Sequence, residues 1–474
     1  MKVIITSALC LTAFGLHAAN APWPQFRGPG GSGIAEGQKP VTDLSKSLLW
    51  QVAIPSGASS PVIAGDRIFL TGFDSGKLLT FCVSRKDGKE LWRAEAPAPS
   101  IEHYHAIEGS PAASSVATDG ERVVAYFGSC GLLCYDLDGK ELWRAAMPVA
   151  ETNNDFGSGT SPILDEGRVF LVRDLAKDSA LFCFDLKTGK PLWKTPRDGF
   201  FTSYSTPLLW RHDGMKELVV GGGLRLKAYD PATGAERWVI RELPSVNCTT
   251  PVADEAMLYF GGWTPGGVDA PMPEFSELLK ADTDGDGAVS KAEAAKTFLK
   301  DFFDANDTNK DGFIKKEEWD AMIGYLKSGK TGVVGIKPGA KGDATETNVA
   351  WRVDRGLPYV PTPLVYRGHL YFFKDGGMAS CFDAKTGKPV YTQSRLGLEG
   401  AMYSSPVAAD GRIYGISVRG VAFDFKAEGD KPEVISKADL GERACATPAI
   451  VDNVIYYRTA TKLWAFGEGG KPLP

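Results

Sequence analysis

Short apolar runs alternate with polar residues along nearly the whole chain. Runs such as RIFLTG at residues 67–72 and RVFLV at residues 168–172 are five or six residues long and lie next to Gly, Asp or Glu residues. This alternation is typical of half-buried antiparallel strands joined by tight turns. The pattern predicts a protein built mainly from short β-strands.

The strand pairs recur with a period of about 44 residues. Each repeat begins with Ser or Thr, followed by Pro in all but one case, and the intervals between successive starts are 55, 46, 45, 44, 112, 43 and 42 residues. Removing residues 266–330 reduces the long interval to 47. Four strands per repeat at this period predict an all-β, eight-bladed β-propeller. The first residues of the repeats are Ser60, Ser115, Ser161, Thr206, Thr250, Thr362, Ser405 and Thr447.

The eighth repeat ends after LWAF and lacks the final strand that carries an aromatic residue in the other repeats. A strand of the missing type, SLLWQVAI around Trp50, precedes the first repeat. Pairing this strand with the eighth repeat would remove two exposed sheet edges. We therefore expect the N-terminal strand to close the ring.

Three features of the sequence resemble a known family. The pattern D-x-x-T-G-K-x-x-W at Asp185–Trp193 and the Ser-Pro or Thr-Pro starts are similar to the repeats of PQQ-like (pyrroloquinoline-quinone-like) β-propellers. That family includes quinoprotein dehydrogenases and outer-membrane assembly-factor propellers. The stretch WPQFRGPGGSG from Trp23 resembles the mature N-terminus of secreted bacterial members. The resemblance implies the fold, and a propeller scaffold can host many functions.

The long interval contains two stretches in which oxygen-bearing side chains recur at the spacing typical of EF-hand calcium loops. Calcium takes six to eight oxygen ligands, and the loop supplies them from alternate positions with a closing Glu. The first loop offers Asp282, Asp284, Asp286, the carbonyl of Ala288, Ser290 and Glu293; the second offers Asp307, Asn309, Asp311, the carbonyl of Phe313 and Glu318. Lys315 stands where the first loop has Ser290, so the second site is expected to be the weaker.

Apolar residues suggest how the two loops pair. Val289 and Ile314 occupy the same loop position, where paired EF-hand loops usually touch. The sequence thus predicts two Ca²⁺ sites in a compact insert within the loop between the second and third strands of the fifth blade.

The N-terminus predicts export. One early Lys2, an apolar run from Val3 to Leu16 and small residues around Ala19 form a signal-peptide pattern, and no later run is long enough to span a membrane. We expect a signal peptide at 1–21, blades at 22–265, the EF-hand pair at 266–331 and the remaining blades at 332–474, in a soluble periplasmic or extracellular monomer.

Seven cysteines follow the predicted cleavage site. Cys82, Cys183 and Cys381 occupy equivalent strand positions and are expected to be core residues. Cys130 with Cys134, and Cys248 with Cys445, remain alternatives for disulfides.

The net charge of −5 gives no indication of nucleic-acid binding. The insert accounts for it, because residues 266–330 hold 14 acidic and 9 basic side chains.

The segments between blades are candidates for a ligand site at the mouth of the central channel. Aromatic, amide and carboxylate groups would suit a polar small molecule, a saccharide or a protein partner; the alternative is that these residues only plug the channel. A metal site at Glu102, His103, His105 and Glu108 is a weaker possibility. The candidate ligand-binding residues are Tyr104, His105, Asn153, Asn154, Asp155, Phe201, Tyr204, Tyr359 and Tyr403.

No serine-type triad, nucleophilic cysteine setting or phosphate loop stands out. The quinone-dependent enzymes that the repeats resemble hold their cofactor with adjacent cysteines, and this chain has no Cys-Cys pair. PQQ is therefore not the expected cofactor. The sequence favours a calcium-binding, non-catalytic ligand-binding or interaction scaffold over a PQQ-dependent oxidoreductase or a polysaccharide-acting enzyme.

Overall fold

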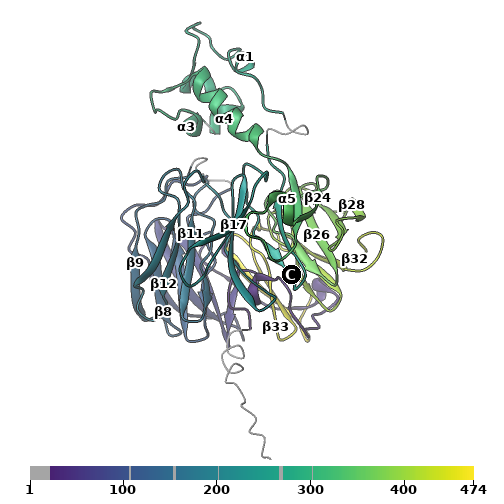
Figure 1. Ribbon diagram of the computed structural model, residues 1–474. Coiled ribbons are helices and arrows are strands. Elements are labelled where there is room, and N and C mark those ends of the chain that lie inside the picture. The colour runs from purple at the N-terminus through teal and green to yellow at the C-terminus, as the bar shows by residue number, and fades with distance from the viewer. Residues whose placement is uncertain are drawn as a thin grey trace, which may run out of the picture.

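The computed structural model describes residues 22–105, 108–152, 156–200, 202–265, 271–301 and 303–473. The signal peptide predicted at residues 1–21 lies outside them. Eight sheets of four or five strands form a ring, with a small helical insert above one face (Figure 1). The predicted eight-bladed propeller is confirmed.

Seven blades follow the chain from the inner strand (A) to the outer strand (D). In chain order their strands are β2 (Val62–Ala64), β3 (Arg67–Asp74), β4 (Lys77–Ser84) and β5 (Glu90–Glu95); β6 (Ala117–Thr118), β7 (Arg122–Phe127), β8 (Gly131–Asp136) and β9 (Glu141–Ala146); β10 (Ile163–Asp165), β11 (Arg168–Arg173), β12 (Ala180–Asp185) and β13 (Pro191–Pro196); β14 (Leu208–His212), β15 (Met215–Gly222), β16 (Arg225–Tyr229) and β17 (Glu236–Ile240); β18 (Val252–Ala253), β19 (Leu258–Gly262), β22 (Gly332–Ile336) and β24 (Val349–Val353); β25 (Leu364–Tyr366), β26 (His369–Lys374), β27 (Met378–Asp383) and β28 (Pro389–Arg395); β29 (Val407–Ala409), β30 (Arg412–Ile416), β31 (Val421–Lys426) and β32 (Val434–Asp439).

The eighth blade joins the two ends of the chain. It consists of β33 (Ala449–Val451), β34 (Val454–Arg458), β35 (Lys462–Phe466) and, from the N-terminal part, β1 (Leu48–Ala53). Trp50 faces Ala465 in the antiparallel register of β1 and β35. The closing strand predicted from the sequence is therefore in place.

The repeat starts form a closed belt of hydrogen bonds. In each blade the backbone N–H of the first Ser or Thr donates to the hydroxyl of the equivalent residue in the next blade, over 2.8–3.1 Å. We call these eight residues, Ser60 to Thr447, the hydroxyl belt. All of them are buried, and the belt satisfies backbone donors that would otherwise be left unpaired around the channel.

The repeat motif that ends in Trp also joins neighbouring blades. The indole N–H of Trp143 in the outer strand β9 donates to the carbonyl of Leu186 in the next blade, at 2.9 Å. Gly189 lies against the indole, where a Cβ would come within 2.5 Å of a ring carbon, and its φ is +69°. Trp50, Trp92, Trp193 and Trp351 make the same kind of bond to the following blade.

Cysteines occupy the strand next to these outer strands. Cys82, Cys183 and Cys381 face Trp92, Trp193 and Tyr391 across the β-ladder, as expected from their equivalence, and Cys134 faces Trp143 in the same way. All seven cysteines of the described chain are free thiols, so neither candidate disulfide is formed.

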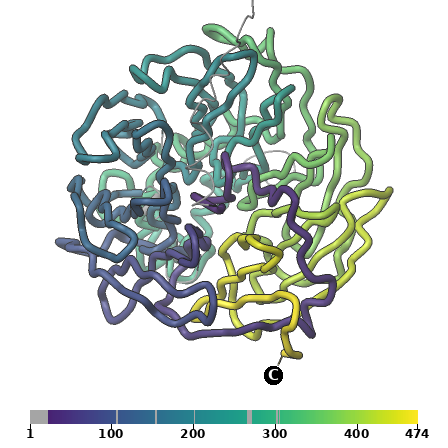
Figure 2. The backbone as a smooth tube through the Cα atoms, turned by 90° about the horizontal axis from the view of Figure 1, so that it is seen from below, coloured from purple at the N-terminus to yellow at the C-terminus, as the bar shows by residue number. Residues whose placement is uncertain are grey.

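The segment before β1 closes the lower end of the channel. Seen from the face opposite the insert, it runs across the middle of the ring (Figure 2). Hydrogen bonds hold it to several blades. For example, the Thr118 N–H donates to the carbonyl of Pro24 and the Ala35 N–H donates to the carbonyl of Ala408, both at 2.8 Å. Arg27 is fully buried and donates to the carbonyls of Gly31, Ser32 and Thr362. Short turns η2 (Pro29–Gly31) and η3 (Leu44–Lys46) lie in this segment.

The insert leaves the ring between β19 and β22, as the sequence predicted. It contains α1 (Phe275–Leu278), β20 (Val289–Ser290), α2 (Lys291–Ala294), η4 (Phe298–Asp301), α3 (Phe303–Asn306), β21 (Phe313–Ile314) and α4 (Lys316–Ser328). Its apolar core is its own, with Phe275, Leu299, Phe303, Trp319 and Ile323 among the buried members. The C-terminal end of α4 contacts the ring (Figure 1), where the Tyr325 hydroxyl donates to the carbonyl of Ser245 at 2.8 Å.

The fourth blade carries a fifth strand. β23 (Gly342–Asp343), followed by α5 (Thr345–Asn348), pairs in parallel with β17, so that Trp238 faces Gly342. This covers the outer edge of that blade.

Candidate functional site

A cavity of about 220 Å³ occupies the central channel on the side of the insert. Phe26 of the N-terminal segment forms its floor, and all eight residues of the hydroxyl belt line its wall. The rim is formed by the segments that join the outer strand of one blade to the inner strand of the next, which we call the D–A connections. The cavity therefore has a closed lower end and a rim on the face that carries the insert.

A second layer lies two residues before the belt in every blade. Successive side chains of an extended chain point to opposite sides, so residues two apart share a side. All eight members of this layer line the cavity: Ala58, Ala113, Gly159, Tyr204, Cys248, Val360, Tyr403 and Cys445. The side chains of this layer are small on the first three blades and larger on the other five, so the cavity is asymmetric.

One carboxylate lies on the rim. Glu108 is exposed, and its Oε1 accepts a hydrogen bond from the Tyr403 hydroxyl at 3.1 Å. Its backbone N–H donates to Nδ1 of His105 at 3.1 Å. Burial raises the pKa of the Cys248 thiol to about 12. Burial, together with the nearby charge of Glu108, also raises the pKa of the Tyr403 phenol. These groups are thus neutral at physiological pH.

The candidate ligand residues divide into three groups. Tyr204, Tyr359 and Tyr403 line the cavity. Tyr104 and His105 lie beside it, with their rings packed against Phe73 and Phe156. Asn153, Asn154, Asp155 and Phe201 lie outside the described residues.

Several cavity residues do not stand out in the sequence. The sequence indicates Glu108 only as a candidate metal ligand, and it does not single out Phe26, Cys248 or Cys445 as ligand-binding residues. The sequence positions of the two cysteines could have predicted that they line the channel, because each lies two residues before the first residue of a repeat.

The described residues between Glu102 and Glu108 do not form a cluster of metal-ligating side chains. His103 is exposed, whereas Glu102 is 2% exposed and accepts from the N–H and hydroxyl of Ser158, at 3.0 and 2.7 Å. Among the described residues, three or more metal-ligating side chains come together only at Asp282, Asp284 and Glu293. Burial raises the pKa of Glu102 to about 7, with the hydrogen bonds from Ser158 and the charge of Arg173 acting against it.

The first EF-hand loop holds its acidic side chains close together. One carboxylate oxygen from each of Asp282, Asp284 and Glu293 lies within 4.8 Å of the others. Glu293 accepts from the N–H and hydroxyl groups of both Thr283 and Ser290, at 2.6–2.9 Å, and these bonds lower its pKa to about 2. An ionised, positioned carboxylate at the last loop position suits a Ca²⁺ ion.

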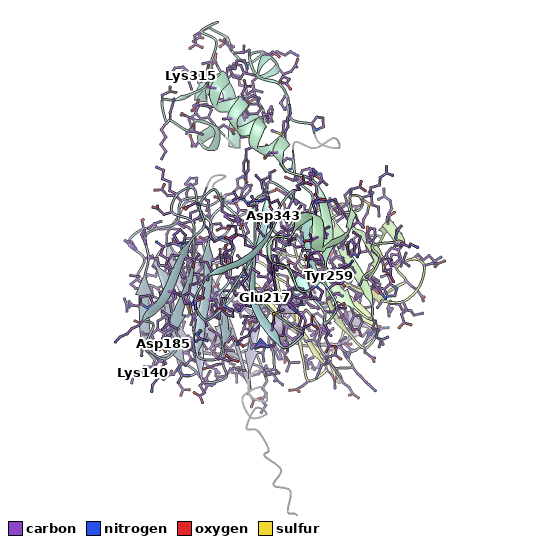
Figure 3. The ribbon with its side chains drawn as sticks, in the orientation of Figure 1. Lys140, Asp185, Glu217, Tyr259, Lys315 and Asp343 are labelled. Carbon is purple, nitrogen blue, oxygen red and sulfur yellow. The ribbon has the colours of Figure 1, made fainter. Side chains whose placement is uncertain are left out.

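The second loop has the same design with two departures. Glu318 accepts from the N–H and hydroxyl of Thr308, each at 2.9 Å. The ammonium of Lys315 bonds to Asp311, one of the expected ligands, and lies at the end of the insert away from the ring (Figure 3). Lys310 has φ +60° where the first loop has Gly285 at φ +77°, a backbone conformation that is unfavourable for a residue with a side chain.

The two loops pair as expected, because Val289 faces Ile314 in the short ladder of β20 and β21. Among the described residues, the insert and the cavity are separate sites. None of the lining residues comes from the described part of the insert.

The cavity does not fit an anionic quinone. Among its described lining residues Glu108 is the one charged group, and neither a cation nor a tryptophan lines it. A polyanionic cofactor would meet like charge and no compensating cation among these described residues.

Comparisons with known proteins agree with this architecture. A family model described as outer membrane protein assembly factor BamB matches residues 41–207 and again 79–245, and an EF-hand model matches residues 277–293 and 299–323. The outer membrane protein assembly factor BamB of Burkholderia pseudomallei (strain K96243) is 25% identical over 158 residues, which cover 33% of this chain and 34% of that protein. The match spans about a third of that relative's length.

Solved structures share the fold. BamB from Moraxella catarrhalis superposes with a TM-score of 0.53 at 14% identity, covering 88% of this chain and 98% of that one. Quinohemoprotein alcohol dehydrogenase from Comamonas testosteroni superposes with a TM-score of 0.59 at 12% identity, covering 97% and 82%. In the described part of the chain, no helix is long and apolar enough to cross a membrane. The repeats, the ring and the paired loops together make this chain an eight-bladed β-propeller that is similar to PQQ-like repeat proteins, with an insert that is similar to an EF-hand pair.

Proposed function

We propose that the protein is an exported, calcium-binding propeller scaffold that binds a ligand or a protein partner at its channel face and performs no catalysis there. The observation that carries the calcium part is the cluster of Asp282, Asp284 and Glu293 oxygens within 4.8 Å. In the first loop the ligands would be Asp282, Asp284, Asp286, the carbonyl of Ala288, Ser290 and Glu293. In the second they would be Asp307, Asn309, Asp311, the carbonyl of Phe313 and Glu318.

The binding role is supported by the cavity and by the relatives. A lined, closed-bottom cavity at the mouth of the channel is a common type of ligand site. BamB is by name an assembly factor of the outer membrane, and a periplasmic scaffold that contacts proteins is the role we propose by analogy. The insert stands on the same face as the cavity and would present calcium-dependent structure beside a bound partner.

Calcium titration of the mature chain tests the first part. We expect calorimetry to show two sites, the first loop binding more tightly because Lys315 competes for Asp311 in the second. Glu293→Gln should remove the tighter site and Glu318→Gln the weaker one. Glu317→Gln is the matched control, since Glu317 is next to Glu318 on the same helix but is not at a ligand position; absence of calcium heat in the unaltered chain would refute the proposal.

A further inference from the structure

The described residues that line the channel cavity include one charged side chain, and it is acidic. Of the described residues that line the cavity, Glu108 is the one acidic side chain and none is Lys, Arg or His, while burial raises the pKa of the Cys248 thiol and of the Tyr359 and Tyr403 phenols. Tyr403 donates to Glu108 and thereby holds the carboxylate at the rim. A ligand in this cavity would find an anion at its edge and no competing cation in the lining.

Aromatic rings make up much of the remaining surface. Phe26 lies on the floor, and Phe156, Tyr204, Tyr359 and Tyr403 stand around the wall. Their arrangement is fixed by edge-to-face packing, with Phe156 against Tyr204 at 6.5 Å between ring centroids and Tyr359 against Trp263 at 5.1 Å. Electron-rich ring faces attract cations, more strongly where water is excluded.

A neighbouring cation shows that such a contact already occurs here. The guanidinium carbon of Arg443 lies 5.8 Å from the centroid of the Tyr403 ring, and Arg443 is not one of the residues that line the cavity. The ring of Tyr403 thus takes part in a cation–π contact and in a hydrogen bond to Glu108 at the same time.

We infer that the cavity binds an organic cation, an ammonium or guanidinium group held between the aromatic wall and Glu108. This inference rests on the ligand-binding role proposed for the channel face. The group could belong to a small molecule with a quaternary ammonium or to a Lys side chain of a partner. About 220 Å³ accommodates one such group and excludes folded protein.

The test compares two ligands of the same shape. Choline and 3,3-dimethylbutan-1-ol differ in charge but hardly in size, so their affinities for the mature protein, measured by calorimetry or ligand-observed NMR, isolate the effect of the positive charge. We expect choline to bind at least about tenfold more tightly, because the anion and the ring faces act only on the cation. Equal affinity for the two ligands would overturn the inference, and so would the absence of binding to either.

Variants locate the site. Glu108→Gln should reduce the preference for choline several-fold, whereas Glu399→Gln, which changes an exposed carboxylate paired with Arg419 outside the cavity lining, should retain it. Both variants should melt like the unaltered protein. A preference that survives Glu108→Gln, or tighter binding of a neutral monosaccharide than of choline, would contradict a cation site.

Two further measurements identify the natural source of the cation and separate the cation site from the calcium proposal. Tighter binding of N-acetyl-lysine-methylamide than of choline would indicate a protein side chain as the natural occupant, and the reverse a small molecule. The variant Glu293→Gln with Glu318→Gln should bind choline normally, so failure of the calcium proposal and failure of the cation site are distinguishable.

Discussion

The backbone N–H of Thr447 donates to the Oγ of Ser60 at 3.0 Å, joining two residues 387 positions apart in the chain. This bond is the last of the eight in the hydroxyl belt and the one that closes it. Since both residues are buried, neither group can exchange its partner freely for water.

Ser60→Ala should lower the free energy of unfolding by about 1–3 kcal/mol, because it leaves the Thr447 N–H without its acceptor in a buried place. Urea denaturation measures the change. Ser56→Ala is the control; its hydroxyl bonds to the carbonyl of Phe73 on the surface, and its loss should cost less than about 0.5 kcal/mol. Equal effects of the two changes would show that the belt adds little stability.

Gly189→Ala tests the contact between the turn of one blade and the tryptophan of its neighbour. The new methyl group would lie 2.5 Å from the Trp143 ring, and the residue would keep a positive φ. Gly167→Ala provides the matched control, because Gly167 also has a positive φ of +76° but no atom within 4 Å of the Cβ position. The control should cost about 1 kcal/mol and Gly189→Ala about 1–3 kcal/mol more in denaturant unfolding; similar values would mean that the indole moves away at little cost.

Glu102 should make stability depend on pH. Its folded pKa of about 7 lies above the ordinary value of 4.5, so the folded state holds a proton that the unfolded state has lost. The resulting stabilisation of the protonated form is complete below about pH 4.5 and is lost as the pH rises through 7. Unfolding measured from pH 5 to 8 should show this decline, roughly 3 kcal/mol at most.

Glu102→Gln, which stays neutral, should flatten this decline and leave the protein more stable than the unaltered chain at pH 8. The exposed Glu399→Gln variant should keep the original slope. An unchanged slope in Glu102→Gln would assign the pH dependence to another group.

Calcium removal should act on the insert and spare the ring. The insert has its own core and contacts the ring through the end of α4, for example from Tyr325 to Ser245. Chelation should therefore leave the main melting transition nearly unchanged while hydrogen exchange rises within residues 282–318 and, through the α4 contact, at residues 243–247. Unfolding of the whole chain on chelation would instead make calcium structural for the ring.

Features that repeat, or that have a fixed spacing, could be predicted from the sequence. The eight starts, the closing strand at Trp50 and the pairing of Val289 with Ile314 follow from local patterns that recur in known architectures. The hydrogen bonds between the first residues of the repeats could not be predicted from the sequence. They join residues at least 42 positions apart, and these residues become neighbours only when the ring closes.

Unrepeated contacts could not be predicted. The N-terminal segment that forms the floor of the cavity has no internal copy, and Arg27 reaches the carbonyl of Thr362 across 335 positions. The burial of Glu102 is likewise a tertiary effect, since its sequence neighbours His103 and Tyr104 are more exposed. Only some of the cavity residues could be predicted from the sequence, because the residues that line the cavity come from all eight blades.

The insert begins and ends on two paired strands, with Gly262 facing Gly332. In the first blade the same loop position is filled by two residues, Ser75 and Gly76, between Asp74 and Lys77, which face each other in the same way. The two flanking strands therefore pair in the same way whether the loop between them holds two residues or the whole insert. A change of loop at this point leaves the strand pairing of the blade as it is, so the calcium binding that we propose for the insert can be gained or lost separately from the propeller.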